Sequence, residues 1–124
     1  MGPELDALAR ECPGAVFRFV YVAEAHAQDE WPLRSARFAA APIVVDQPRT
    51  LAARLALARR YAADYGITSP VVVDDPRDEG FERAYAPWPL RLYVVRGAAV
   101  AWIAEPDGAS YERSIAELRA MLLP

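Results

Sequence analysis

Apolar residues change their spacing along the chain, and this spacing predicts alternating helices and strands. Residues 4–11 have apolar positions at helical spacing, and a run of β-branched and aromatic residues at 15–22 predicts a buried strand. The strongest helical period covers residues 51–65. We expect Asp46 to cap this helix, since its carboxylate can accept free amide groups, and Gly66 to end it, since glycine tolerates a left-handed backbone.

The long helix at 51–65 has one apolar face, and its basic residues fall largely off that face. The apolar face consists of Leu51, Leu55, Ala58, Ala62 and Tyr65. The basic residues on and beside the helix are Arg49, Arg54, Arg59 and Arg60. This separation is typical of a helix that packs on a sheet, so we predict that the arginines form its solvated face.

Two stretches on either side of the long helix break the simple pattern. The connection at 31–41 has no clean period and is longer than usual, which favours a functional role, and a brief apolar run follows at 43–45. Beyond the helix, residues 70–73 predict a second strand and 78–85 a short helix. The acidic residues between them predict a turn and a helix start in preference to a cation site. They are Asp74, Asp75, Asp78 and Glu79.

The last third of the chain predicts a hairpin followed by a helix. Strands at 90–95 and 98–104 flank the turn Arg96-Gly97, so we expect them to pair antiparallel. The final helix begins near residue 110, and its buried face comprises Tyr111, Ile115, Leu118 and Leu122. The element order predicts a single α/β domain over 1–124, with a mixed sheet and helices on both of its faces.

Composition and charge limit the classes of function. The chain has 124 residues, 54% of them hydrophobic, and a net charge of −3, which gives no reason to expect a nucleic-acid partner. No apolar run approaches the roughly 20 residues that span a bilayer, and the N-terminus looks helical, unlike a signal peptide. We therefore predict a cytoplasmic protein with no membrane partner. All 14 basic residues are arginine, which suggests a GC-rich bacterial genome.

Candidate chemistry gathers just after the 15–22 strand, where open α/β sheets place their ligand sites. Glu24, His26, Asp29 and Trp31 follow within a few positions. An imidazole can exchange a proton near neutral pH, the carboxylates could fix its tautomer or bind substrate, and an indole can stack on an aromatic ligand. The alternative is an ordinary loop whose tryptophan covers the strand end. A weak metal site is also conceivable, but no further ligand is evident, so we predict none.

These residues carry a resemblance to a known family. Glu24-Ala25-His26, Asp29 and Trp31, directly after the strand Phe19-Val20-Tyr21-Val22, resemble the strand and EAHxxDxW segment of the iodothyronine deiodinases. Weaker likenesses extend over nearly the whole chain, at 59–67, 72–75, 84–85, 91–95 and 110–111. The specific part of the resemblance is the segment around His26, since the rest is general to thioredoxin-like folds.

The resemblance implies a thioredoxin-like fold and a reductive chemistry. It implies removal of iodine through a selenocysteine or cysteine, with a thiol co-substrate as reductant and no bound cofactor. By the same resemblance Glu24 and His26 are the catalytic candidates, and Trp31 would contact the small-molecule substrate. Asp29 is a further substrate-binding candidate, because its carboxylate lies in the same polar segment. Trp88-Pro89 stands where thioredoxin-like folds carry a cis-proline beside the active site, which makes both residues substrate-binding candidates.

The chain departs from the family at the reactive atom. The family's nucleophile follows a first strand, and neither that strand nor the nucleophile is present here. Cys12 is the only cysteine, so it allows no intramolecular disulfide, and it lies at the C-terminal end of the first helix, the wrong end for a thiolate. Three explanations are open: the chain is N-terminally truncated, the two strands that flank the missing one pair directly, or another chain supplies the strand.

Two further classes of function therefore stand beside a deiodinase-like oxidoreductase. The chain could be a non-catalytic binding module that keeps the family's pocket. It could also be a subunit that completes its sheet with another chain, in a homodimer for example. The sequence does not identify the substrate, and peroxide or disulfide substrates are as open as iodinated aromatics.

Overall fold

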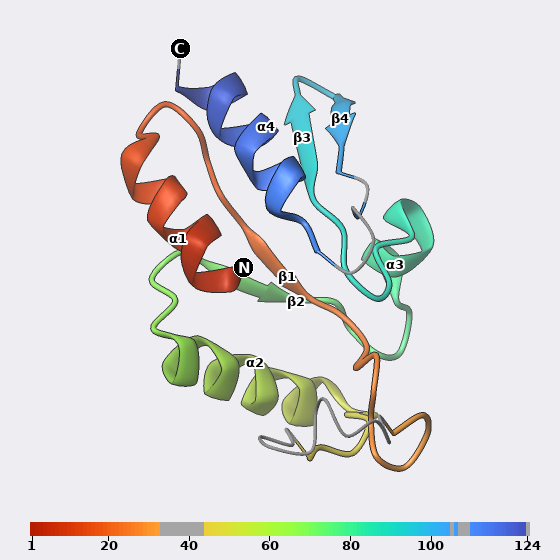
Figure 1. Cartoon of the computed structure of the whole chain (residues 1–124). Coiled ribbons are helices and arrows are strands. Elements are labelled where there is room, and N and C mark those ends of the chain that lie inside the picture. The colour runs from red at the N-terminus through yellow and green to blue at the C-terminus, as the bar shows by residue number, and fades with distance from the viewer. Residues whose placement is uncertain (33–43, 105, 107–109, 124) are drawn as a thin grey trace.

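A computed structural model describes residues 1–32, 44–104, 106 and 110–123. Four helices and four short strands alternate along these residues (Figure 1). In chain order the elements are α1 (Gly2–Glu11), β1 (Phe19–Tyr21), α2 (Leu51–Tyr65), β2 (Val71–Val73), α3 (Gly80–Tyr85), β3 (Tyr93–Arg96), β4 (Ala99–Ile103) and α4 (Glu112–Leu122). Most of the connection predicted at 31–41, and the first residue of the 43–45 run, lie outside the described residues.

The described strands form two small sheets, where the sequence predicted one mixed sheet. β1 pairs parallel with β2, with Val20 opposite Val72, and β3 pairs antiparallel with β4 around Gly97, whose φ is +62°. The predicted hairpin is thus confirmed. Direct pairing of the 15–22 and 90–95 strands is not found among the described residues. Side chains from both regions instead share a hydrophobic core, to which Phe19 and Leu92 contribute.

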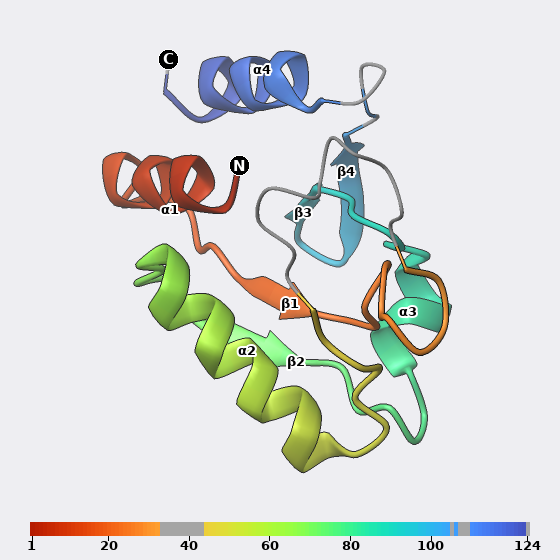
Figure 2. The same ribbon diagram turned by 60° about the horizontal axis from the view of Figure 1, so that its bottom comes forward.

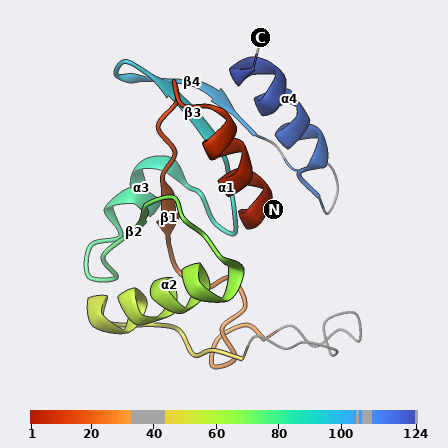
Figure 3. The ribbon, with the colours of Figure 1, turned by 90° about the vertical axis from the view of Figure 1, so that its left-hand side faces the viewer.

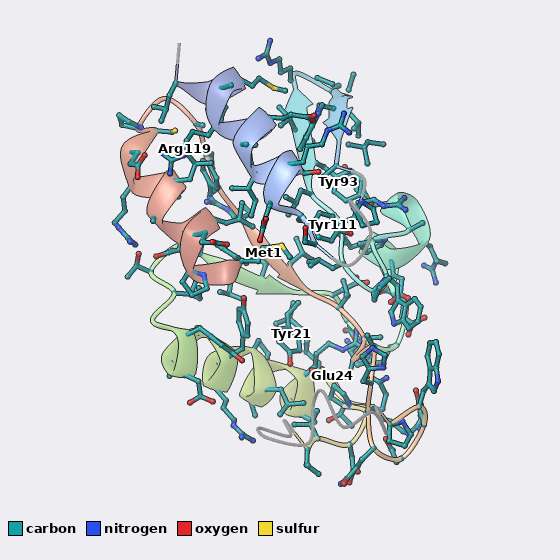
Figure 4. The ribbon with its side chains drawn as sticks, in the orientation of Figure 1. Met1, Tyr21, Glu24, Tyr93, Tyr111 and Arg119 are labelled. Atoms are coloured by element: carbon teal, nitrogen blue, oxygen red, sulfur yellow. The ribbon has the colours of Figure 1, made fainter. Side chains whose placement is uncertain are left out.

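The helices lie on both sides of the strands, as predicted. α1 and α4 lie side by side on one side, and α2 lies on the other (Figure 2 and Figure 3). Leu5 and Leu8 of α1 pack with Cys12 and with Leu118 of α4 to form the buried centre of the core. An ion pair between Arg119 and Glu11 joins the ends of the two helices (Figure 4). Their apolar faces are therefore covered mainly by each other and by the strands.

Element boundaries differ from prediction where local contacts decide them. β1 covers only 19–21, because the residues before it have no strand partner among the described residues, and Val16 is 80% exposed. Thr50, not Asp46, caps α2: its Oγ1 accepts the amide of Ala53 at 3.2 Å. The carboxylate of Asp46 accepts a hydrogen bond from Gln28 Nε2 at 2.8 Å and so is used elsewhere.

The predicted division of α2 into an apolar and a solvated face is wrong at two residues. Arg54 is buried, with 1% of its surface exposed, whereas Tyr65 is 43% exposed. Arg54 turns inward because its Nη1 donates to the backbone oxygen of Asp74, just past β2, at 2.9 Å. Tyr65 lies in the last turn of the helix, where its ring contacts that of Tyr61 on the same helix. Ala58 is buried as expected.

Asp6 fastens α1 to the segment before β2, a contact that the sequence did not suggest. Its buried carboxylate accepts the amides of Thr68 and Ser69 at 3.0 and 2.7 Å and the hydroxyl of Thr68 at 2.9 Å. Arg10 adds an ion pair. Burial alone would raise the pKa of the Asp6 carboxyl, but the hydrogen bonds from Ser69 and Thr68 outweigh it and hold the pKa well below its usual value.

The acidic residues after β2 form a turn and a helix start, as predicted. The buried carboxylate of Asp74 accepts the amides of Phe81 and Glu82 at 2.9 and 3.0 Å and so caps α3. Among the described residues, no group of three histidines, cysteines or acids could hold a metal ion. In the same part of the chain, no helix is long and apolar enough to cross a membrane.

Candidate functional site

The polar loop that follows β1 is held by the segment that leads into α2. The amide of Gln28 donates to the backbone oxygen of Val45 at 2.9 Å, and the amide of Gln47 donates to Asp29 Oδ1 at the same distance. A turn within the loop brings the amide of Trp31 to the oxygen of Ala27, which is buried. These contacts fix the backbone of 23–31 in front of the N-terminal end of α2.

Gln47 is the centre of this attachment, and sequence analysis missed it because a lone glutamine carries no motif. Its side-chain oxygen accepts the amide of Glu24 at 2.9 Å, and its Nε2 donates to the backbone oxygen of Glu24 and to Glu30 Oε2, both at 3.1 Å. Gln47 therefore binds both the backbone amide and the backbone oxygen of Glu24, which sets the direction of the Glu24 side chain.

The side chain of Glu24 meets the hydroxyl of Tyr21, the last residue of β1. Tyr21 donates a hydrogen bond to Glu24 Oε1, and both side chains lie beside α2 (Figure 4). Burial raises the pKa of the Tyr21 phenol well above its usual value, and the adjacent Glu24 carboxylate adds to the increase. Tyr21 thus remains a hydrogen-bond donor to Glu24 over the whole neutral range.

Three predicted site residues form a row of rings. His26 lies 5.5 Å from Trp31 between ring centroids, and Trp31 stacks on Trp88 at 5.8 Å with an angle of 17° between the rings. The row joins the loop after β1 to the segment before β3. The peptide bond between Trp88 and Pro89 is cis. The structure therefore brings His26 into the neighbourhood of Pro89.

A cavity of about 290 Å³ lies against these rings. Its walls include Glu24, Trp31 and Trp88 from the predicted set, together with Ala23, Ala25, Glu30, Gln47 and Glu82. Sequence analysis did not single out Glu82, whose Oε2 is buried without a hydrogen-bond partner among the described residues. His26, Asp29 and Pro89 do not line the cavity. A planar ligand could lie against the indoles with the carboxylates of Glu24 and Glu82 at its edge.

The two acids near the histidine have other partners. Asp29 accepts from Gln47 and lies 3.7 Å from the guanidinium of Arg49, while Glu24 accepts from Tyr21. His26 is exposed, and its Nδ1 lies 3.4 Å from the backbone oxygen of Trp31. In the described residues neither acid therefore fixes the histidine tautomer. Asp29 instead holds its own loop to the segment before α2, through Gln47 and Arg49.

Cys12 lies away from the cavity. It is the C-cap residue of α1, and it is buried in the core with 4% of its surface exposed. Its position at the C-terminal end of the helix agrees with the prediction. The cavity therefore offers aromatic surface, carboxylates and a nearby imidazole, and Cys12 contributes no sulfur to it.

Comparison with known families adds one finding. The family model described as iodothyronine deiodinase matches residues 8–123, which is nearly the whole chain. The matched region contains every residue of the cavity and of the row of rings.

Proposed function

The chain belongs to the iodothyronine deiodinase family, a family of oxidoreductases, and on this premise we propose that its cavity holds a halogenated aromatic substrate for reduction by thiols or a selenol. In that reaction an aryl carbon–iodine bond is replaced by carbon–hydrogen, iodide is released, and two thiols are oxidised to a disulfide. The observation that carries the proposal is the stack of Trp31 on Trp88 beside His26, since it offers a planar aromatic surface next to a proton-exchanging group.

Each side chain has a distinct role in this proposal. Trp31 and Trp88 hold the aromatic ring, and His26 relays the proton that replaces iodine. Glu24, kept in place by Tyr21 and Gln47, hydrogen-bonds a polar group of the substrate. Asp29 supports the loop and does not touch the substrate. The reductant is a small-molecule thiol, and no bound cofactor is needed.

We propose that the fold is thioredoxin-like and that these 124 residues do not include the strand that carries the nucleophile. Three features support this: the parallel pair β1–β2, the β3–β4 hairpin and the terminal helix α4. Among the described residues β1 and β3 each have a strand partner on one edge only.

The chain by itself should therefore have little reductive activity, because its only cysteine is buried in the core. The test is release of iodide from thyroxine with dithiothreitol as reductant, for this chain and for one extended upstream in the genomic frame. We expect iodide release from the extended chain only. Equal rates in both chains would contradict the proposal.

Variants of the extended chain separate the proposed roles. His26→Gln should lower kcat about a hundredfold with little change in KM, since it removes a proton relay. Trp88→Ala should mainly raise KM. Arg59→Gln, an exposed change on α2, is the matched control and should alter neither constant. An unchanged kcat in His26→Gln would remove histidine from the mechanism.

A binding module without catalysis is the second candidate, because the indoles are accessible while the only cysteine of the sequence is buried in the core. Trp31 is 61% and Trp88 38% exposed. This candidate predicts that the chain quenches its tryptophan fluorescence on binding thyroxine, and that the extended chain binds equally well but releases no iodide. A sheet-completing homodimer would instead give a sedimentation coefficient that rises with concentration.

A further inference from the structure

A second cavity, of about 200 Å³, adjoins the one beside the tryptophans. The two share Ala23, Glu30 and Gln47 in their walls. The second cavity differs in charge, because two basic side chains, Arg49 and Arg54, also line it. A ligand that occupies the first cavity could therefore extend a substituent toward these two arginines, which share the wall with the carboxylates of Glu30 and Glu79.

Arg54 is the unusual member of this second wall. It is 1% exposed. Within the described residues it makes one hydrogen bond, from Nη1 to the backbone oxygen of Asp74, and its buried Nε has no partner. No carboxylate of the described residues lies within ion-pair distance of its guanidinium. A buried charge is normally paired, and a buried donor is normally satisfied, because both lose their hydration on folding.

The acids on the same wall do not supply the missing partner. Glu30 is held by Arg49 at 2.8 Å and by Gln47 at 3.1 Å. Glu79 lines the cavity but is exposed and forms no ion pair with Arg54. Asp75, in the turn after β2, is close enough for Arg54 to help lower the pKa of its carboxyl, but the main cause of that shift is Arg77, which pairs with Asp75. Among the described residues no carboxylate is therefore paired with Arg54 itself.

We propose that the cavity beside Arg54 binds an oxyanion, and that this group is the carboxylate of a ligand whose aromatic ring lies on Trp31 and Trp88. The guanidinium fork suits an oxyanion because it offers several donors in one plane. The position of the ring rests on the proposed function, whereas the oxyanion site rests on Arg54, with Arg49 beside it in the wall of the second cavity. Inorganic phosphate is also an oxyanion that a guanidinium can bind, so the test must distinguish free phosphate from the carboxylate of an aromatic ligand.

The test measures binding to the chain as it is, by tryptophan fluorescence and calorimetry, and requires no catalytic turnover. The probes are phenylpropanoate, its neutral analogue phenylpropanamide, and inorganic phosphate. We expect the acid to bind about ten- to a hundredfold more tightly than the amide, the range for a hydrogen bond to a charged group. Phosphate should compete with the acid and not with the amide.

Variants assign that preference to Arg54. In Arg54→Gln the affinity for the acid should fall to that of the amide, while Arg59→Gln, an exposed arginine of the same helix, should leave the preference intact. If Arg54→Gln does not fold, Arg54→Lys and Arg49→Gln replace it. Arg54→Lys should keep part of the preference, and Arg49→Gln, whose side chain is 68% exposed, should reduce it several-fold.

The outcomes are distinct. Equal affinity for acid and amide, with no phosphate competition, would overturn the oxyanion site. Phosphate binding that depends on Arg54, without a preference for acid over amide, would support the oxyanion site but overturn the aromatic ligand as its source. Failure of the extended chain to release iodide would count against the proposed reaction and leave this binding result unaffected.

Discussion

The protein buries two charged side chains equally deeply and treats them in opposite ways. Asp6 and Arg54 are each 1% exposed. Asp6 accepts three hydrogen bonds from Thr68 and Ser69 and pairs with Arg10. In the part of the chain that the structure describes, Arg54 donates one hydrogen bond and its Nε has no partner. Burial alone therefore does not reveal what a charged residue is for. The degree to which its polar atoms are satisfied separates a structural charge from a candidate binding charge.

The largest effect that this comparison predicts is on stability at Asp6. Asp6→Ala leaves two backbone amides and a hydroxyl without their acceptor, so we expect a loss of about 3 kcal/mol in the free energy of unfolding. Urea denaturation followed by circular dichroism measures it. Glu4→Ala, on the same helix with a side chain 66% exposed, should change stability by less than about 1 kcal/mol. A loss of stability at Asp6 as small as that at Glu4 would contradict the view that Asp6 is a structural charge.

A weaker form of the same perturbation is protonation of Asp6. The folded pKa of this carboxyl lies below its ordinary value of 3.8, so its contribution to stability is fully present above that value and is lost as the pH falls toward the folded pKa. The stability difference between the native chain and Asp6→Ala should therefore be constant near neutrality and shrink below about pH 4. Denaturation curves at a series of pH values test this. If the difference in the free energy of unfolding between the native chain and Asp6→Ala grew as the pH fell, this prediction would be contradicted.

Asp74 offers an intermediate case, because its buried carboxylate accepts two amides at the start of α3. Asp74→Ala should lower the free energy of unfolding by about 2 kcal/mol, less than the change at Asp6, since one fewer donor is left unpaired. Asp78→Ala is a suitable control, because Asp78 lies in the same turn and is exposed. Equal losses at Asp74 and Asp78 would show that burial of the cap is unimportant.

The smallest predicted change is at Arg54. Arg54→Met removes one hydrogen bond but also removes a buried charge without a paired carboxylate, and these effects oppose each other. The free energy of unfolding should therefore change by less than about 1 kcal/mol, while the preference for phenylpropanoate over its amide disappears. Thermal and urea denaturation provide the measurement. A loss as large as that in Asp6→Ala would mean that Arg54 is a structural charge after all.

Sequence patterns located the helices better than they located these two charges. The helical period at 51–65 gave the bounds of α2 correctly, because repeated burial along one face leaves a periodic trace. Arg54 follows the pattern of a solvated face, and only the nearby end of β2 draws it inward. Asp6 looks like an ordinary acid of a short helix, since the amides that its buried carboxylate accepts are 62 and 63 residues away.

The candidate site was predictable to a similar, partial extent. The segment from Glu24 to Trp31 stood out because it places polar groups at the end of a buried strand, and the family resemblance added Trp88 and Pro89. Gln47 could not be found in this way, since its importance arises from geometry between two loops. The two-sheet arrangement could not be predicted from the sequence pattern either, because the spacing of apolar residues does not reveal which strands pair with each other.

The stack of Trp31 on Trp88 gives the protein an intrinsic optical signal. Two nearly parallel indoles at 5.8 Å are close enough for their electronic transitions to couple, and coupled transitions produce a paired positive and negative band in circular dichroism. The remaining tryptophan, Trp102, is in β4 and packs on the core. Loss of that paired band would report separation of the loop after β1 from the segment before β3, even while both helical layers remain folded.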